Sequence, residues 1–360
     1  DRYDASAVAD VIGSDFQIWQ VPVGQELDLL EDLKADPDVE HVQPNYLYHA
    51  HGTPDDPSFG AQWAHGVIRS EDAWDITTGS SSVTIAIIDT GIDAGHPDLE
   101  VKIVDGRDVI DNDNNPHDLN GHGTHVAGIA AAVTDNGVGV AGLDWQAQIM
   151  PIRALDEEGS GTTATITSGI KWAYQNGADI LNLSLGGSSP DPLLEDAVDD
   201  ARAVGSLVVA SMGNCRIVGP DCPVANPTTY PAAYESVIAV AATAPTDGYA
   251  PYSQRGSHCD IAAPGGDMDY LHDPVGIYST MPTYDVFLTD SYNYSKNYDY
   301  LHGTSQAAPH VAGLAALLLA ADPTLTPAQI QAVIEDTAED LGPAGWDQDY
   351  GHGRIDARAA

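Results

Sequence analysis

The chain has 360 residues, a length that favours one large domain with a small addition over several equal domains. Its formal net charge is −41 at pH 7, from 13 basic and 54 acidic side chains, which excludes nucleic acid and anionic membrane surfaces as favourable partners. The longest uninterrupted apolar run, Val311–Ala321, is shorter than the roughly 18–20 residues that cross a bilayer, so no membrane-spanning helix is expected.

The acidic excess has two interpretations. One is adaptation to high salt, because screening over about 3 Å at 1 M removes the repulsion among the carboxylates. The other is a secreted protein that its negative charge keeps soluble, and both stay open. The sequence opens on Asp1-Arg2-Tyr3-Asp4 without a secretory leader. If the protein is secreted, its signal peptide is therefore expected upstream of this sequence.

The first 52 residues have a pattern of their own and are expected to form a small β-α-β unit. The expected elements are a strand at Phe16–Val21, a helix at Gln25–Ala35 and a second strand at Val39–Tyr48. The polar, turn-rich segment Ala50–Pro54 then leads into the rest of the chain, residues 53–360, which is expected to be a second domain.

In that second domain, strands that are apolar on both faces alternate with amphipathic helices. The expected strands are Val83–Asp89, Ile149–Ala154, Ile180–Ser184, Leu207–Ser211 and Val237–Ala242, and the expected helices are Ala73–Gly79, Thr163–Gln175, Leu193–Val204 and one that begins at the capping box Thr326–Gln329. This alternation predicts an α/β fold with a parallel sheet covered by helices on both faces. The tyrosine-rich stretch Tyr284–Tyr300 is expected to be a loop or hairpin insertion.

Three cysteines are too few for a disulfide framework. Cys215 and Cys222 flank a loop short enough to close as a local disulfide if the protein is extracellular, and two free thiols are the alternative. Cys259 is left over and is expected to be buried.

Three short motifs carry the residue types of nucleophilic catalysis. Asp89-Thr90-Gly91 ends an apolar strand, His122-Gly123-Thr124-His125 begins a helix, and Gly303-Thr304-Ser305 precedes the apolar helix His310–Ala321. A serine near a helix start projects its hydroxyl from the helix end, and free backbone N–H groups nearby can donate to a developing oxyanion. Helix N-capping is the alternative role for such a serine.

The chain order Asp…His…Ser, with these flanking residues, resembles the subtilase family and, within it, the thermitase-type branch. The resemblance extends from the linker to the C-terminus and implies a subtilisin-like fold and a secreted serine endopeptidase. It assigns the nucleophile to Ser305 and the general base to His122 rather than His125. It assigns the orientation of that base to Asp89, for which Asp93 in the same loop is a competitor.

The resemblance also implies residues around the triad. Asn214 stands where the family has its oxyanion-hole amide, and a turn-forming asparagine is the alternative. Gly159-Ser160-Gly161 and Ser184-Leu185-Gly186 resemble the two segments that bind a peptide substrate as an added strand. After Ser305 the family usually has methionine, and Gln306 in this chain is expected to alter a nearby pocket without changing the mechanism.

The primary specificity pocket would be walled by Ala210–Gly213, with Gly213 at its end, and by Tyr230-Pro231, whose peptide bond is cis in the family. No acidic residue can be assigned to the floor of this pocket. Broad and mainly apolar specificity is therefore expected.

Two calcium sites are expected, because hard oxygen ligands at alternate positions suit calcium better than zinc. A weaker loop site resembling one in thermitase-like enzymes would use Asp108, Asp111, Asp113 and the Asn115 carbonyl, with His117 a poor substitute for the family's glutamine. A tighter site would use Asp56, Asp98, the Asn136 side chain and the carbonyls of Val133, Val138 and Val140. A solvated surface charge is the alternative for each aspartate.

The first 52 residues resemble the later half of a subtilase propeptide, which implies an intramolecular chaperone and inhibitor that is cleaved off at the linker. A small structural extension is the alternative. The implied partners are protein or peptide substrates and the chain's own N-terminal segment, and a monomer is expected. Two other function classes stay open: a pseudoprotease that binds peptides without cleaving them, and a narrow processing enzyme of the proprotein-convertase kind.

Overall fold

The computed structural model describes residues 6–11, 13–14, 16–21, 26–43, 53–220 and 222–360, which fall into two compact units, residues 1–50 and 51–360. In the first unit, β1 (Ser6–Asp10) pairs antiparallel with β2 (Gln17–Gln20), and α1 (Glu26–Lys34) follows. The expected strand at residues 39–48 is absent from described residues 39–43, and its remainder lies outside the described residues. The short strand β1 was not predicted, because its sequence alternates weakly and it depends on its pairing with β2.

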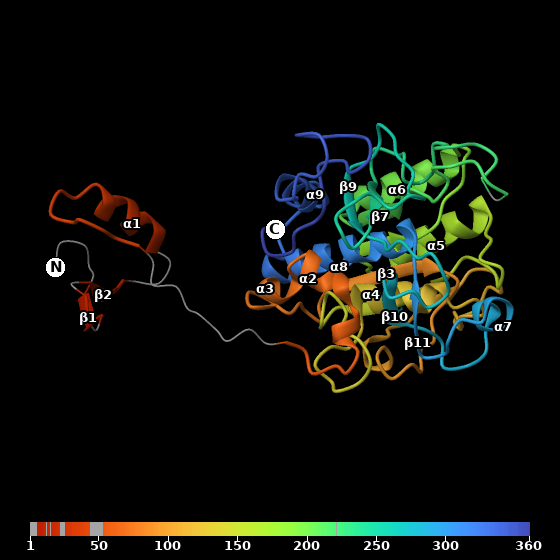
Figure 1. The fold of residues 1–360 in the computed structure, drawn as a ribbon, viewed down its shortest axis with the longest axis horizontal. Helices are drawn as coiled ribbons and strands as arrows, with labels where there is room; N and C mark the ends of the chain where they lie inside the picture. The colour runs from red at the N-terminus through yellow and green to blue at the C-terminus, as the bar shows by residue number, and fades with distance from the viewer. Residues whose placement is uncertain (1–5, 12, 15, 22–25, 44–52, 221) are drawn as a thin grey trace. The chain divides into compact units, whose positions relative to one another are not determined.

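The second unit is built on a seven-stranded sheet with the order β4-β5-β3-β6-β7-β8-β9, in which every pair is parallel. Strands β3, β7 and β9 of this sheet are labelled in Figure 1. The strands are β3 (Thr84–Asp89), β4 (Arg107–Asp108), β5 (Gln148–Arg153), β6 (Ile180–Leu183), β7 (Leu207–Ser211), β8 (Ile238–Thr243) and β9 (Ile261–Pro264). The five inner strands are those predicted. The edge strands β4 and β9 were missed, because two and four residues carry too little pattern to be recognised.

Helices cover both faces of this sheet. On one face lie α4 (His122–Ala131) and α8 (Thr304–Ala321), and on the other lie α5 (Thr163–Gln175) and α6 (Pro192–Ala203). The other helices of this unit are α2 (Trp63–Val67), α3 (Ser70–Trp74), α7 (Phe287–Tyr292) and α9 (Pro327–Asp336). Along β3, Ile85 belongs to the buried cluster that contains α4 and α8, and Ile88 belongs to the cluster that contains α5 and α6. The predicted α/β fold with a parallel sheet and helices on both faces is therefore confirmed.

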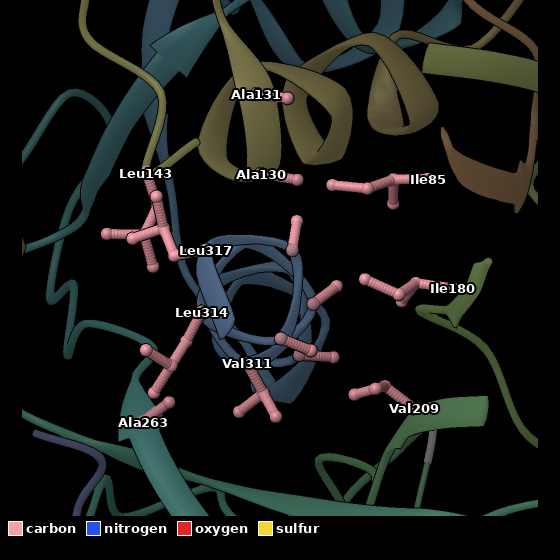
Figure 2. Packing of buried hydrophobic residues seen from close by; sticks show 14 of the residues in the cluster. Ile85, Ala130, Ala131, Leu143, Ile180, Val209, Ala263, Val311, Leu314 and Leu317 are labelled. Carbon is pink, nitrogen blue, oxygen red and sulfur yellow. The ribbon is translucent and has the colours of Figure 1, made fainter. Parts of the chain in front are cut away.

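Helix α8 lies in the centre of the core. Figure 2 shows its side chains Val311, Leu314 and Leu317 among residues of the sheet and of α4. Helices α4 and α8 approach closely at Gly313, where an added Cβ would lie 2.8 Å from the Ala130 carbonyl oxygen. Among the described residues only α8 is long and apolar enough to cross a membrane, and 78% of its 18-residue window is buried inside the protein, as in a core helix.

One predicted helix was wrong. Instead of a helix at Ala73–Gly79, the chain forms α3, which ends at Trp74. The buried Trp74 indole donates to the Leu143 carbonyl, and Gly79 (φ +105°) lies directly against the Asp144 carboxylate. These contacts with a distant loop require the chain to leave the helix after Trp74.

Three local expectations are confirmed. Cys215 and Cys222 form a disulfide and Cys259 is buried. The capping box at the start of α9 is present, with Thr326 accepting from the Gln329 amide. The tyrosine-rich insertion lies within a hairpin, since β10 (Ile277–Thr280) pairs antiparallel with β11 (Tyr298–Leu301) and α7 lies between them.

Candidate active site

The three motif residues occupy the ends of three elements. Asp89 is the last residue of β3, His122 is the first residue of α4, and Ser305 is the second residue of α8. In a parallel sheet the carboxyl ends of the strands lie at one edge, and polar residues gathered there form sites on a rigid frame. The N-cap of α8 is Gly303, so Ser305 does not have the capping role that was its alternative.

Asp89 and His122 form a hydrogen-bonded pair. His122 Nδ1 donates to Asp89 Oδ1 at 2.7 Å, and Asp89 is completely buried. Burial acts to lower the pKa of His122, but the charge and hydrogen bond of Asp89 outweigh it, so this pKa lies above 6.5. The pair leaves Nε2 of His122 free to act as a general base, with its tautomer set by the carboxylate.

The two competing residues have other partners. His125 is buried, donates from Nε2 to the carbonyls of Ile277 and Asp299, and has a pKa lowered to about 3 by burial. Asp93 accepts from the amide and the hydroxyl of Thr283. The geometry therefore favours His122 and Asp89 over these neighbours.

The acid limb of activity tests this pair. We expect kcat/KM to decrease as the pH falls through a midpoint that lies above 6.5. His122 acts as a base only when its imidazole is neutral, and the charge of Asp89 stabilises the protonated form. Asp89→Asn should move the midpoint to lower pH and lower kcat by about 10⁴-fold, since the carboxylate no longer sets the tautomer. The control is Asp93→Asn, which should leave the midpoint in place. A midpoint that does not move in Asp89→Asn contradicts the assignment.

Ser305 is held against the end of β6. Its Oγ donates to the Ser184 carbonyl at 3.1 Å, and the Ser184 hydroxyl donates to the Ser305 carbonyl at 2.7 Å. The predicted substrate segment 184–186 therefore lies directly beside the candidate nucleophile. Ser184 and Leu185 are buried, whereas Gly186 is exposed.

The other predicted substrate segment, Gly159-Ser160-Gly161, is an exposed turn after β5. The Asn120 side chain donates to the Glu157 carbonyl, which ties this turn to the loop that leads into His122. Gly159 has φ +78°, and an added Cβ there would lie 3.7 Å from Asn120 Nδ2. The turn thus borders the loop of the candidate base.

Asn214 lies beside the start of α8. Its Oδ1 accepts from the amide and hydroxyl of Thr304, at 2.9 and 3.0 Å. With its oxygen held in this way, the Nδ2 group remains to donate, and an added Cβ on Gly303 would lie 3.2 Å from it. The side chain can therefore donate to an oxyanion formed at Ser305.

We expect Asn214→Ala to lower kcat by about 10²- to 10³-fold with little change in KM, because the amide donates mainly to charge that develops in the transition state. The measurement is steady-state hydrolysis of a peptide substrate. Asn176→Ala, at the exposed C-cap of α5, is the matched control and should retain full activity. A loss confined to KM would instead assign Asn214 to substrate binding.

Sequence reasoning missed a buried carboxylate behind the pair, Asp118. Its oxygens accept from the hydroxyls of Thr90 and Thr124 and from the amides of Asn120, Gly121 and Thr124. Thr90 follows Asp89, and Thr124 lies in the first turn of α4, so Asp118 fixes the strand end against the helix start. The feature of the sequence that could have identified Asp118 is its position four residues before His122.

Gln254, which the sequence did not suggest as a site residue, lies against Gly213, at the end of the predicted pocket wall. Gln254 is buried and donates to the Pro227 carbonyl and the Thr229 hydroxyl. An added Cβ on Gly213 would lie 2.5 Å from Gln254 Oε1, so only glycine fits there. The bond between Tyr230 and Pro231 is cis, as expected.

The residues of the predicted tighter metal site come together. Asp98 accepts from the Asn136 side chain and the Val140 amide, and Asp56 accepts from the amides of Asp135 and Asn136. Both carboxylates are buried, and burial together with the nearby Asp98 raises the pKa of Asp56 against its backbone hydrogen bonds. In the described part of the chain neither forms an ion pair with a basic side chain.

Two buried carboxylates without a basic partner fit a bound cation, and the donor set of carboxylate, amide and carbonyl oxygens fits calcium. Among the described residues no cluster of three or more acidic, histidine or cysteine side chains could hold a metal. The carbonyls of Val133, Val138 and Val140 would therefore have to complete the coordination.

The predicted weaker loop already contains a cation of its own. Arg153 Nη1 donates to Asp108 Oδ2 at 2.7 Å and to Asp111 Oδ2 at 2.8 Å. Asp113 accepts from the Asn115 amide at 2.8 Å, while His117 stacks on Tyr284. A metal ion here would compete with the guanidinium, so these residues fit calcium less well than the buried pair.

Comparison with known proteins agrees with this geometry. The model of the subtilase family, Peptidase S8, matches residues 80–353. The chain is 41% identical to a thermophilic serine proteinase of Bacillus sp. strain AK1, over 95% of this chain and 77% of that protein. It is 42% identical to thermitase of Thermoactinomyces vulgaris, over 86% of this chain and 99% of that protein. A solved protease structure from Pseudoalteromonas arctica matches with a TM-score of 0.76 and 35% identity, covering 86% of this chain and 98% of that one.

Proposed function

The chain belongs to the subtilase family and is a subtilisin-like serine endopeptidase, and we propose that Asp89, His122 and Ser305 are its catalytic triad. The observation that carries the proposal is the 2.7 Å hydrogen bond from His122 to the buried Asp89, at the sheet edge where β3 meets the start of α4. The resemblance to subtilases noted from the sequence is confirmed at the level of the family.

In the proposed mechanism, Ser305 Oγ attacks the scissile carbonyl carbon while His122 Nε2 accepts its proton. The imidazolium then gives that proton to the leaving amine, and Asp89 stabilises the charged ring. The oxyanion accepts hydrogen bonds from Asn214 Nδ2 and from a backbone N–H at the start of α8. Water activated by His122 hydrolyses the acyl-enzyme and restores Ser305.

We propose that the substrate is an extended peptide bound between residues 159–161 and 184–186. Main-chain hydrogen bonds from such a strand are independent of side chains, which gives broad specificity. Gly213 and Gln254 at the primary pocket bring no charge to it, which supports mainly apolar residues there.

The test is incubation of the wild-type chain and Ser305→Ala with casein and with a peptide library, with and without calcium. We expect wild type alone to cleave both, mainly after apolar residues. Cleavage only after paired basic residues would identify a narrow processing enzyme. No cleavage by the wild type would identify a pseudoprotease.

We further propose one tight calcium ion at Asp56, Asp98 and Asn136 and a weaker one at the loop of Asp108. Calcium at the first site would neutralise two buried carboxylates and hold the start of the second unit to the loop after α4. Extracellular location is supported by the Cys215–Cys222 disulfide, since such bonds persist in oxidising surroundings.

The first unit is proposed to be a propeptide that inhibits and assists folding before it is cleaved at the linker, and the mature enzyme to act as a monomer. The net charge of −41 supports function at high salt, where the mutual repulsion of carboxylates is screened.

A further inference from the structure

Helix α8 contains a proline, Pro309, at a position where a backbone N–H would normally donate a hydrogen bond to the first turn of the helix. In an α-helix the N–H of residue 309 would donate to the carbonyl of residue 305. Pro309 has no N–H, and its ring crowds the carbonyl four residues earlier. The main-chain carbonyl of the proposed nucleophile, Ser305, therefore has no partner within its own helix at this position.

The hydroxyl of Ser184 takes the place of the missing amide. Ser184 Oγ donates to the Ser305 carbonyl at 2.7 Å, from the residue that follows β6. The buried Asn182, within β6, donates from Nδ2 to Ser184 Oγ at 3.0 Å. Because Asn182 occupies Ser184 Oγ as an acceptor, the hydroxyl hydrogen points to the Ser305 carbonyl.

We infer that the Ser184 side chain is a positioning residue that holds Ser305 by replacing the amide that Pro309 cannot supply. The inference rests on the proposed role of Ser305 as nucleophile. The inference gives two groups of Ser184 different roles. The Ser184 carbonyl lies in the segment proposed to pair with substrate, whereas the Ser184 hydroxyl holds the helix that contains the nucleophile.

The physical consequence is a rate effect. Without the hydroxyl, the part-buried carbonyl of Ser305 loses its partner, and the first turn of α8 shifts to find another. A displacement well below 1 Å at a nucleophile slows attack, while peptide binding through main-chain groups is unaffected. The loss should therefore appear in kcat and not in KM.

The first experiment compares Ser184→Ala with the full-length wild type. We expect kcat on a peptide substrate to fall roughly 10-fold with KM within about 2-fold. The rate of covalent inactivation by a sulfonyl fluoride, which reports the reactivity of Ser305 without a peptide, should fall in parallel. Ser184→Cys keeps the shape of the side chain with a somewhat larger atom that donates weakly, so it gives the same test without a cavity.

The matched control is Ser206→Ala. Ser206 is as buried as Ser184, with 4% of its surface exposed, and its hydroxyl also donates to a main-chain carbonyl, that of Ala178, at 2.7 Å. It precedes β7, at the end of the sheet away from the site, so its loss should leave kcat and the inactivation rate unchanged.

Pro309→Ala distinguishes a positioning role of the Ser184 hydroxyl from a merely structural one by its effect on kcat. Alanine restores the N–H of residue 309, so it should raise kcat more in the Ser184→Ala background than in the wild-type background. Equal effects in both backgrounds, or a kcat of Ser184→Ala and Ser184→Cys equal to wild type, overturn the inference. The proposed nucleophile fails separately, if Ser305→Ala cleaves as well as wild type.

Discussion

Replacing Ser305 by alanine is expected to lower kcat by about 10⁶-fold while the protein remains folded. Removing the serine of an Asp–His–Ser triad abolishes acyl-enzyme formation, and what remains is the contribution of the oxyanion donors and of substrate binding. The variant should still bind peptides, because segments 159–161 and 184–186 are intact. The measurement is kcat on a peptide substrate, with thermal unfolding as the check on folding.

The same variant tests the N-terminal unit. If residues 1–52 are a propeptide that the enzyme removes itself, wild type should be shortened at the linker and Ser305→Ala should stay full-length. Adding a trace of active wild type should then cleave the variant at the same bond, read by mass spectrometry. A wild-type chain that keeps the first 52 residues while it digests casein contradicts the propeptide proposal.

Removing calcium is expected to lower the melting temperature by about 8 °C. A ligand present at 1,000 times its Kd stabilises the folded state by about 4 kcal/mol, and each kcal/mol shifts the melting temperature of a large domain by about 2 °C. Without the ion, no cation neutralises the buried carboxylates of Asp56 and Asp98, and burial together with the charge of Asp98 raises the pKa of Asp56. The measurement is thermal unfolding of Ser305→Ala, to avoid self-digestion, in excess EDTA and in excess calcium.

Variants locate the effect. Asp98→Asn should lose most of the response to calcium, while Asp196→Asn, on the exposed face of α6, should respond as wild type does. Repeating the comparison in low and high sodium chloride separates calcium from the acidic surface, since salt screens the surface charge at either calcium level. An equal melting temperature in EDTA and in calcium refutes the tight site. Unchanged activity and stability at low salt, with calcium supplied, refute the high-salt interpretation.

Sequence reasoning succeeded where a residue's environment is set by its near neighbours. The apolar segments of β3, β5, β6, β7 and β8 show their strand type directly, because buried parallel strands are apolar on both faces. The capping box at Thr326 depends on only four residues. The helix expected at Ala73–Gly79 was wrong because Trp74 and Gly79 contact a loop that lies nearly 70 residues further along the chain.

Around the site, the sequence by itself determined the residue types and their chain order, and with them the family. Only the tertiary structure decided how Asp118 joins the end of β3 to the start of α4 and how the Ser184 hydroxyl serves the Ser305 carbonyl. The physical reason is that the hydrogen bonds of Asp118 with Thr90, 28 residues away, and of Ser184 with Ser305, 121 residues away, depend on donor–acceptor distances below 3.5 Å, which no local pattern encodes. The sequence motifs identify the reacting groups, and the packing of β3, β6, α4 and α8 sets the distances between these groups.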